Sequence, residues 1–181
     1  MTTTGQLDPG LFSDAAISAE TRAVNDGIVR LMDGMADWWV VGPDKVRAAR
    51  MSGESVFPAP VLSDRAKAIA IDGPGGKIEL RIIAPANPRG VYLHYHGGGH
   101  VLGSASQQDR LLEIIADATS LTAISVEYRL APENPWPAGP DDCETAARWV
   151  VDHLKDFGGS KLATGGAFSA VSMRKNRFAP S

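Results

Sequence analysis

The stretch YLHYHGGGHVLG, from Tyr92 to Gly103, places three consecutive glycines between two histidines, directly after an alternating apolar run. Alternation with a period of two is typical of a β-strand. Glycine loses more backbone freedom on folding than any other residue, so three adjacent glycines carry an entropic cost. Consecutive glycines are expected where a side chain would obstruct the backbone. The stretch therefore predicts a strand followed by a loop of specific backbone shape.

Residues on the C-terminal side of this loop alternate between helix and strand patterns. These patterns cover, in chain order, residues 107–120, 122–128, 141–158 and 161–166. A single helix between two strands favours a right-handed crossover, which makes the two strands parallel. We therefore expect residues 91–95, 123–128 and 161–164 to form neighbouring parallel strands.

Residues on the N-terminal side predict helices and then a hairpin. Helical spacing of apolar residues runs through residues 11–50, where Ser13 can cap the first helical segment. The period then changes to two, because residues 67–72 and 77–83 read as strands on either side of the turn sequence GPGG.

The expected fold class is therefore α/β. The pattern predicts a mostly parallel central sheet, preceded by an antiparallel hairpin and by a helical N-terminal cap segment. The prolines of the stretch FPAPVLSD indicate an extended linker. We place the helical cap segment and linker in residues 1–60 and the sheet domain in residues 61–181.

Composition narrows the range of partners. The chain of 181 residues is 44% hydrophobic and 22% charged, which is ordinary for a globular protein. Its formal charge is -3 and its 18 basic residues are scattered, so we expect no nucleic-acid partner. The sequence shows neither a signal-peptide pattern nor an apolar stretch of membrane-spanning length. We expect no membrane partner and a cytoplasmic location.

The glycine loop lies where α/β proteins commonly place a binding or catalytic site. In parallel α/β sheets, ligands bind just beyond the carboxyl ends of the strands. The sequence HGGGH, residues 96–100, follows such a strand. Consecutive N–H groups turned toward one space can stabilise an oxygen that acquires negative charge, and side chains there would obstruct that approach.

Two motifs in this order carry a resemblance to a known family. Together, HGGGH and the later YRLAPENPWPAGPDD, residues 128–142, resemble the hallmarks of the hormone-sensitive-lipase-like branch of the α/β-hydrolase esterases and lipases. The resemblance runs from about residue 45 to residue 166. It implies an incomplete α/β-hydrolase fold and the activity of a carboxylic ester hydrolase acting on a small acyl ester.

The resemblance also implies roles for particular residues. The HGGG motif is His96, Gly97, Gly98 and Gly99. By the resemblance, Gly98 and Gly99 supply the oxyanion donors and His96 organises the loop. The later motif braces the oxyanion loop, which makes its Arg129, Glu133 and Asp142 supporting residues.

The sequence departs from the family after the last predicted strand. A serine esterase carries its nucleophile in the pattern G-x-S-x-G. Counting from Gly166, that position holds Phe168, and Ser169 comes one residue late, which makes it a weak candidate nucleophile. No aspartate, glutamate or histidine follows Ser169. We therefore expect an incomplete Ser-Asp-His triad and a sequence truncated or rearranged after Gly166.

Two hypotheses for function stay open at this point. The first is an esterase-like hydrolase that keeps the oxyanion loop and is impaired as an enzyme. The second is an inactive pseudo-hydrolase that binds ligand or pairs with a full-length relative. An exposed sheet edge after the last strand would allow such pairing or self-association.

A third interpretation uses the histidines of the loop. His94 and His96 lie two apart on a strand, so they face the same way, and His100 is close behind, as in a metal-ligand cluster. No aspartate, glutamate or cysteine joins them within the loop. We expect no metal and no cofactor.

Overall fold

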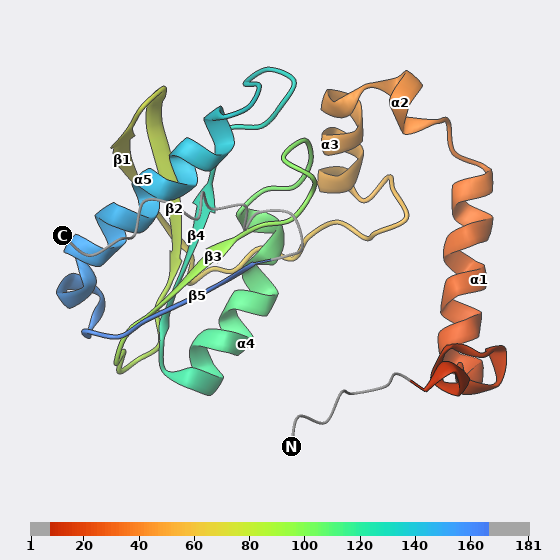
Figure 1. Cartoon of the computed structure of the whole chain (residues 1–181), viewed down its shortest axis with the longest axis horizontal. Coiled ribbons are helices and arrows are strands. Elements are labelled where there is room, and N and C mark those ends of the chain that lie inside the picture. The colour runs from red at the N-terminus through yellow and green to blue at the C-terminus, as the bar shows by residue number, and fades with distance from the viewer. Residues whose placement is uncertain (1–7, 167–181) are drawn as a thin grey trace. The chain divides into compact units, whose positions relative to one another are not determined.

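The computed structural model describes residues 8–166, which divide into two units between Gly42 and Pro43. The first unit is helical (Figure 1). Its elements are η1 (Pro9–Phe12), η2 (Asp14–Ala16), α1 (Ala19–Asp33) and α2 (Trp38–Val41). None of its described residues is buried within the unit.

The helix boundaries of this unit differ from the sequence pattern. Ser13 precedes only a 3-10 turn, and α1 begins instead after Ser18, whose hydroxyl accepts a hydrogen bond from the Thr21 N–H at 3.1 Å. The helix ends at Asp33, and Gly34 is its C-cap. Asp37 then caps a new helix by accepting from the Trp39 N–H at 2.9 Å. Capping divides the continuous helical pattern into separate helices.

The second unit contains a mixed sheet and its covering helices. A five-stranded sheet has the order β1-β2-β4-β3-β5 (Figure 1). In chain order the elements are α3 (Pro43–Ser52), β1 (Lys67–Gly73), β2 (Gly76–Ile83), β3 (Val91–Tyr95), η3 (Ser106–Gln108), α4 (Asp109–Thr119), β4 (Thr122–Glu127), α5 (Ala138–Asp152), η4 (Leu154–Phe157) and β5 (Leu162–Gly166). In residues 8–166 no helix is long and apolar enough to cross a bilayer.

Strand pairing confirms the predicted α/β architecture. Strands β1 and β2 form the antiparallel hairpin, and β2 also pairs antiparallel with β4. Strand β3 pairs in parallel with both β4 and β5. The three predicted parallel strands are therefore neighbours, with bounds that differ from the prediction by at most two residues, and β3 lies between the other two.

Helices cover both faces of this sheet. Alternate residues of β3 and β4, such as Leu93 and Ile124, join one core cluster with the buried face of α5. The intervening residues of the strands, such as Ala123, join a second cluster with Leu112 and Ala116 of α4. The period-two pattern thus divides the strand side chains between two helices.

A buried ion pair anchors the start of α4. Asp109 is fully buried, and its carboxylate accepts hydrogen bonds from Arg81 Nε at 2.6 Å and Arg81 Nη2 at 2.5 Å. The Ser63 N–H donates to the same carboxylate at 2.9 Å. This carboxylate therefore joins the linker, β2 and α4, and its removal would leave the partly buried Arg81 guanidinium without its partner.

Substituting Asp109→Ala is expected to destabilise the fold by about 2–3 kcal/mol, because it leaves the partly buried Arg81 guanidinium and the Ser63 N–H without their partner. The measurement is urea unfolding followed by circular dichroism. The matched control is Asp117→Ala, which removes the partner of Arg65 in an exposed pair on the same helix. The control is expected to change stability little. Equal losses in the two variants would contradict the argument.

Candidate active site

The glycine loop starts between the carboxyl ends of two parallel strands. Tyr95, the last residue of β3, is opposite Val126 of β4 and Gly166 of β5. Gly166 allows this approach, because a Cβ there would lie 2.5 Å from the carbonyl oxygen of Tyr95. The HGGG motif therefore follows the central parallel strand and begins beside the end of β5.

Backbone geometry explains the glycines. Gly98 and Gly99 have φ values of 128° and 65°, in a region that side chains disfavour. A Cβ at Gly98 would overlap the backbone carbonyl of Leu102, and a Cβ at Gly103 would overlap that of Gly97. A Cβ at Gly99 would meet no atom of residues 8–166 within 4 Å. The entropic cost at Gly98 and Gly103 secures close backbone packing, whereas the glycine at position 99 is required by its positive φ.

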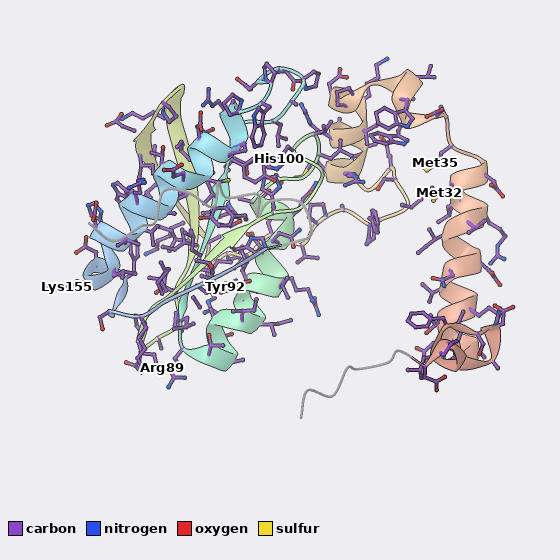
Figure 2. The ribbon with its side chains drawn as sticks, in the orientation of Figure 1. Met32, Met35, Arg89, Tyr92, His100 and Lys155 are labelled. Atoms are coloured by element: carbon purple, nitrogen blue, oxygen red, sulfur yellow. The ribbon has the colours of Figure 1, made fainter. Side chains whose placement is uncertain are left out.

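Hydrogen bonds join parts of the glycine loop to one another and join the loop to the proline-rich segment. The N–H groups of Val101 and Leu102 both donate to the Gly98 carbonyl, at 3.1 and 2.8 Å. The carbonyl of His100, a residue with φ of 59°, accepts from the Ala131 N–H at 2.8 Å. His100 lies in the loop beyond the end of β3, whereas Tyr92 lies within that strand (Figure 2).

His96 is held as a neutral, buried ring. Its imidazole stacks on Tyr128 with ring centroids 4.1 Å apart, and the Tyr128 hydroxyl donates to the His96 carbonyl at 2.5 Å. Burial lowers the pKa of His96, although the hydrogen bond to the Gly97 carbonyl opposes this effect. That bond, 3.0 Å from Nδ1, requires the proton on Nδ1. The His96 ring is thus bound to the first glycine of the loop on one side and stacked on Tyr128 on the other.

His94 is also buried but has a different partner. Its Nδ1 lies 3.0 Å from the hydroxyl of Ser125, the residue opposite it on β4. Burial, with a smaller contribution from His96, lowers the pKa of His94 to about 4. The two histidines are thus bound to separate neighbours. Within residues 8–166, no group of three His, Cys, Asp or Glu side chains is placed to hold a metal ion.

The proline-rich segment, residues 128–142, contains two ion pairs near the loop. Arg129 donates from Nε and Nη2 to the buried carboxylate of Asp142, both at 2.8 Å. Glu133 pairs instead with Arg47 of α3, at 2.9 Å from Nη1. The three supporting residues of this motif thus form two separate ion pairs, one within the motif and one with α3.

Sequence reasoning missed two residues near the loop. Arg47 reaches it from a helix 54 residues earlier in the chain, and no local pattern marks such a contact. Glu127 ends β4, and its carboxylate accepts from the Ala105 N–H at 2.7 Å. Burial raises the pKa of Glu127. An acidic residue at the end of a buried strand was the available signal for this second residue.

The structure describes the HGGG motif but not the candidate nucleophile. Ser169, and Phe168 before it, lie outside the described residues. His96, Gly97, Gly98 and Gly99 all lie within them and form one continuous turn at the end of β3.

Comparisons with known proteins agree with this architecture. Residues 92–170 match a family described as the alpha/beta hydrolase fold. The chain is 34% identical to Esterase LipI of Mycobacterium tuberculosis over 147 residues, covering 74% of this chain and 46% of that protein. It is 36% identical over 94 residues to an arylesterase of Saccharolobus solfataricus, covering 50% of this chain and 31% of the relative.

Solved structures give the same result. An esterase of Pyrobaculum calidifontis aligns with a TM-score of 0.59 at 31% identity, covering 69% of this chain and 43% of that one. LAE6, an alpha/beta hydrolase from the metagenome of Lake Arreo in Spain, aligns with a TM-score of 0.68 at 29% identity, covering 84% and 51%. The chain spans about half the length or less of the relatives it matches.

The sheet order, the crossovers and the loop at the end of β3 define an α/β-hydrolase fold, of which this chain contains a part. Within that class, the chain belongs to the hormone-sensitive-lipase-like branch of the α/β hydrolases.

The buried histidines predict a pH-dependent stability. The pKa of His94 is about 4 in the folded chain and about 6.5 in an unfolded chain, so between these values only the unfolded chain takes up the proton. Stability is therefore lost as the pH falls. We expect His94 to lower the free energy of unfolding by about 2 kcal/mol between pH 7 and pH 5. Urea unfolding at a series of pH values measures this.

The control for this prediction is His94→Gln, which retains a group that can hydrogen-bond to Ser125. This variant is expected to show a shallower slope over the same pH range. Glu127, whose pKa is raised, contributes with the opposite sign in both proteins and does not affect the comparison. An unchanged slope in the variant would assign the pH dependence to other groups.

Proposed function

We propose that this chain provides the oxyanion-binding part of a serine-type carboxylic ester hydrolase acting on a small acyl ester. Gly98 and Gly99 supply the N–H donors, while Gly97 and His96 set the shape of the loop. The observation that carries the proposal is the loop itself, which follows the central parallel strand and holds two successive glycines, Gly98 and Gly99, at positive φ. Esterases among the relatives support the reaction class.

The proposed chemistry places negative charge at the loop. A serine hydroxyl oxygen bonds to the ester carbonyl carbon, and the π electron pair of the carbonyl moves onto its oxygen. Backbone N–H groups that already point at this oxygen stabilise it without reorganising. Collapse of the tetrahedral intermediate restores the carbonyl and expels the alcohol, whose oxygen takes up the proton that the serine hydroxyl lost. Water then attacks the acyl-enzyme, releases the acid and returns a proton to the serine oxygen.

His96 does not act as the proton carrier in this proposal. Its Nδ1–H is bound to the Gly97 carbonyl, its Nε2 is buried, and its pKa is lowered. A general base must reach the proton that it removes. His96 is therefore a positioning residue, which agrees with the role implied by the family resemblance.

A second function has specific observations in its favour. A hydrolase-like chain without catalysis could bind acyl compounds or pair with another chain. β5 lies at one end of the described sheet, and its Ala163 and Thr164 are exposed. An activity measurement on the purified chain separates the two functions.

The test is hydrolysis of p-nitrophenyl acetate by the purified chain and its variants. We expect slow turnover that depends on the loop. A methyl group at Gly99 would meet no atom of residues 8–166 within 4 Å, so Gly99→Ala should fold, with a strain of about 1–2 kcal/mol, and should obstruct the oxygen. We expect its rate to fall about 10-fold or more, since loss of a whole donor costs about 100-fold or more.

The matched control is Gly76→Ala in the β1–β2 hairpin. Gly76 also has a positive φ, of 129°, and a Cβ there also meets no atom within 4 Å. This control is expected to keep the parent rate. Equal rates in all three proteins would reject the loop as the site, and a rate no higher than that of buffer would favour the second function.

Ser169→Ala addresses the nucleophile. Phe168 takes the position that the elbow requires, so Ser169→Ala is expected to leave any slow turnover nearly unchanged. The rate of p-nitrophenol release measures this effect. Robust hydrolysis that the substitution abolishes would instead identify Ser169 as the nucleophile.

A further inference from the structure

One arginine outside both sequence motifs connects the two loops of the candidate site. Arg47 lies in α3, and its Nε donates to the Val101 carbonyl at 2.7 Å. Its Nη2 donates to the Ala131 carbonyl at 2.6 Å. Both guanidinium nitrogens Nη1 and Nη2 also bind the carboxylate of Glu133, at 2.9 and 3.0 Å. A single planar group thus contacts the glycine loop and the proline-rich segment.

The two residues whose carbonyls Arg47 binds also donate their N–H groups to carbonyls of the glycine loop. The Val101 N–H donates to the Gly98 carbonyl, so Val101 closes the turn on one side and is held by Arg47 on the other. The Ala131 N–H donates to the His100 carbonyl, so Ala131 is likewise held from both sides. Displacing the guanidinium would free both carbonyls and loosen the turn that begins at Gly98.

The exposures of the paired side chains argue for positioning more than for stability. The Arg47 side chain is 23% exposed and that of Glu133 is 51% exposed. Ion pairs in such surroundings contribute little to stability. The planar fork of arginine nevertheless fixes direction, because its donors have set angles that a lysine ammonium cannot reproduce. Glu133 holds the plane of this fork through two bonds.

We propose that Arg47 is a positioning residue that fixes the Gly98–Leu102 turn and so the direction of the Gly98 and Gly99 N–H groups. Its effect on ester hydrolysis rests on the function proposed above, whereas its effect on the loop does not. The competing interpretation is that Arg47 only attaches α3 to the sheet domain.

The test uses the full chain labelled with ¹⁵N, and compares Arg47→Ala with the parent protein by amide chemical shifts and hydrogen exchange. We expect the Gly98 and Gly99 amide signals to shift. We also expect the Val101 and Leu102 amides to exchange at least about tenfold faster, because the turn opens locally. The amides of Leu93 and Ile124, within β3 and β4, should keep their exchange rates.

Two further variants make the comparison specific. Arg65→Ala is the matched control, since Arg65 also binds one carbonyl, that of Ala84, and both oxygens of one carboxylate. It should leave the Gly98 and Gly99 signals unchanged. Arg47→Lys should not restore the parent signals, whereas millimolar guanidinium added to Arg47→Ala should move them back toward the parent positions.

The outcomes separate the interpretations. Unchanged glycine amides in Arg47→Ala would overturn the proposal, and so would faster exchange spread evenly over the strands, since either result makes Arg47 an anchor alone. In a p-nitrophenyl acetate assay, Arg47→Ala should lower kcat at least about fivefold with little change in KM. Altered amides in a chain without any hydrolysis would support the positioning role and reject the proposed reaction.

Discussion

The packing of the Gly98 backbone against the Leu102 carbonyl is the constraint on which the candidate site depends. A side chain at Gly98 would overlap that carbonyl, so the turn can close only on a glycine. Once the turn closes, two N–H groups bind the Gly98 carbonyl, and His96 lies buried against Tyr128. These hydrogen bonds and this stacking contact depend on the close approach of Gly98 to Leu102, which brings the two ends of the loop together.

Buried and exposed ion pairs have different uses in this fold. Asp109 and Asp142 are buried carboxylates that each bind one arginine and fix the start of a helix or a loop. Such pairs cost desolvation, and they are retained where a single arrangement is required. Arg47 and Glu133 are more exposed, and their contact is better understood through the carbonyls that the guanidinium also binds.

The sequence predicted the elements that depend on local periodicity. It did not predict the contacts that depend on residues distant in the chain. Period-two runs located the three parallel strands, and the glycines located the turn, because both signals lie within a few residues. The end of α1 was not predicted, since the apolar spacing continues past Gly34 and only the capping contact of Asp37 divides it. Arg47 was missed for a different reason. Its partners lie 54 to 86 residues away, and only the folded sheet brings them within reach.

The lowered pKa values of His94 and His96 have a further consequence for the candidate site. Both rings are uncharged at neutral pH, so neither lends formal positive charge to the start of the loop. In the proposed site, attraction for a developing oxyanion comes from peptide dipoles, which act over a short range and attract few counter-ions. Dissolved salt should therefore reduce the attraction of this loop for an oxyanion far less than it would reduce the attraction of a site built from arginines.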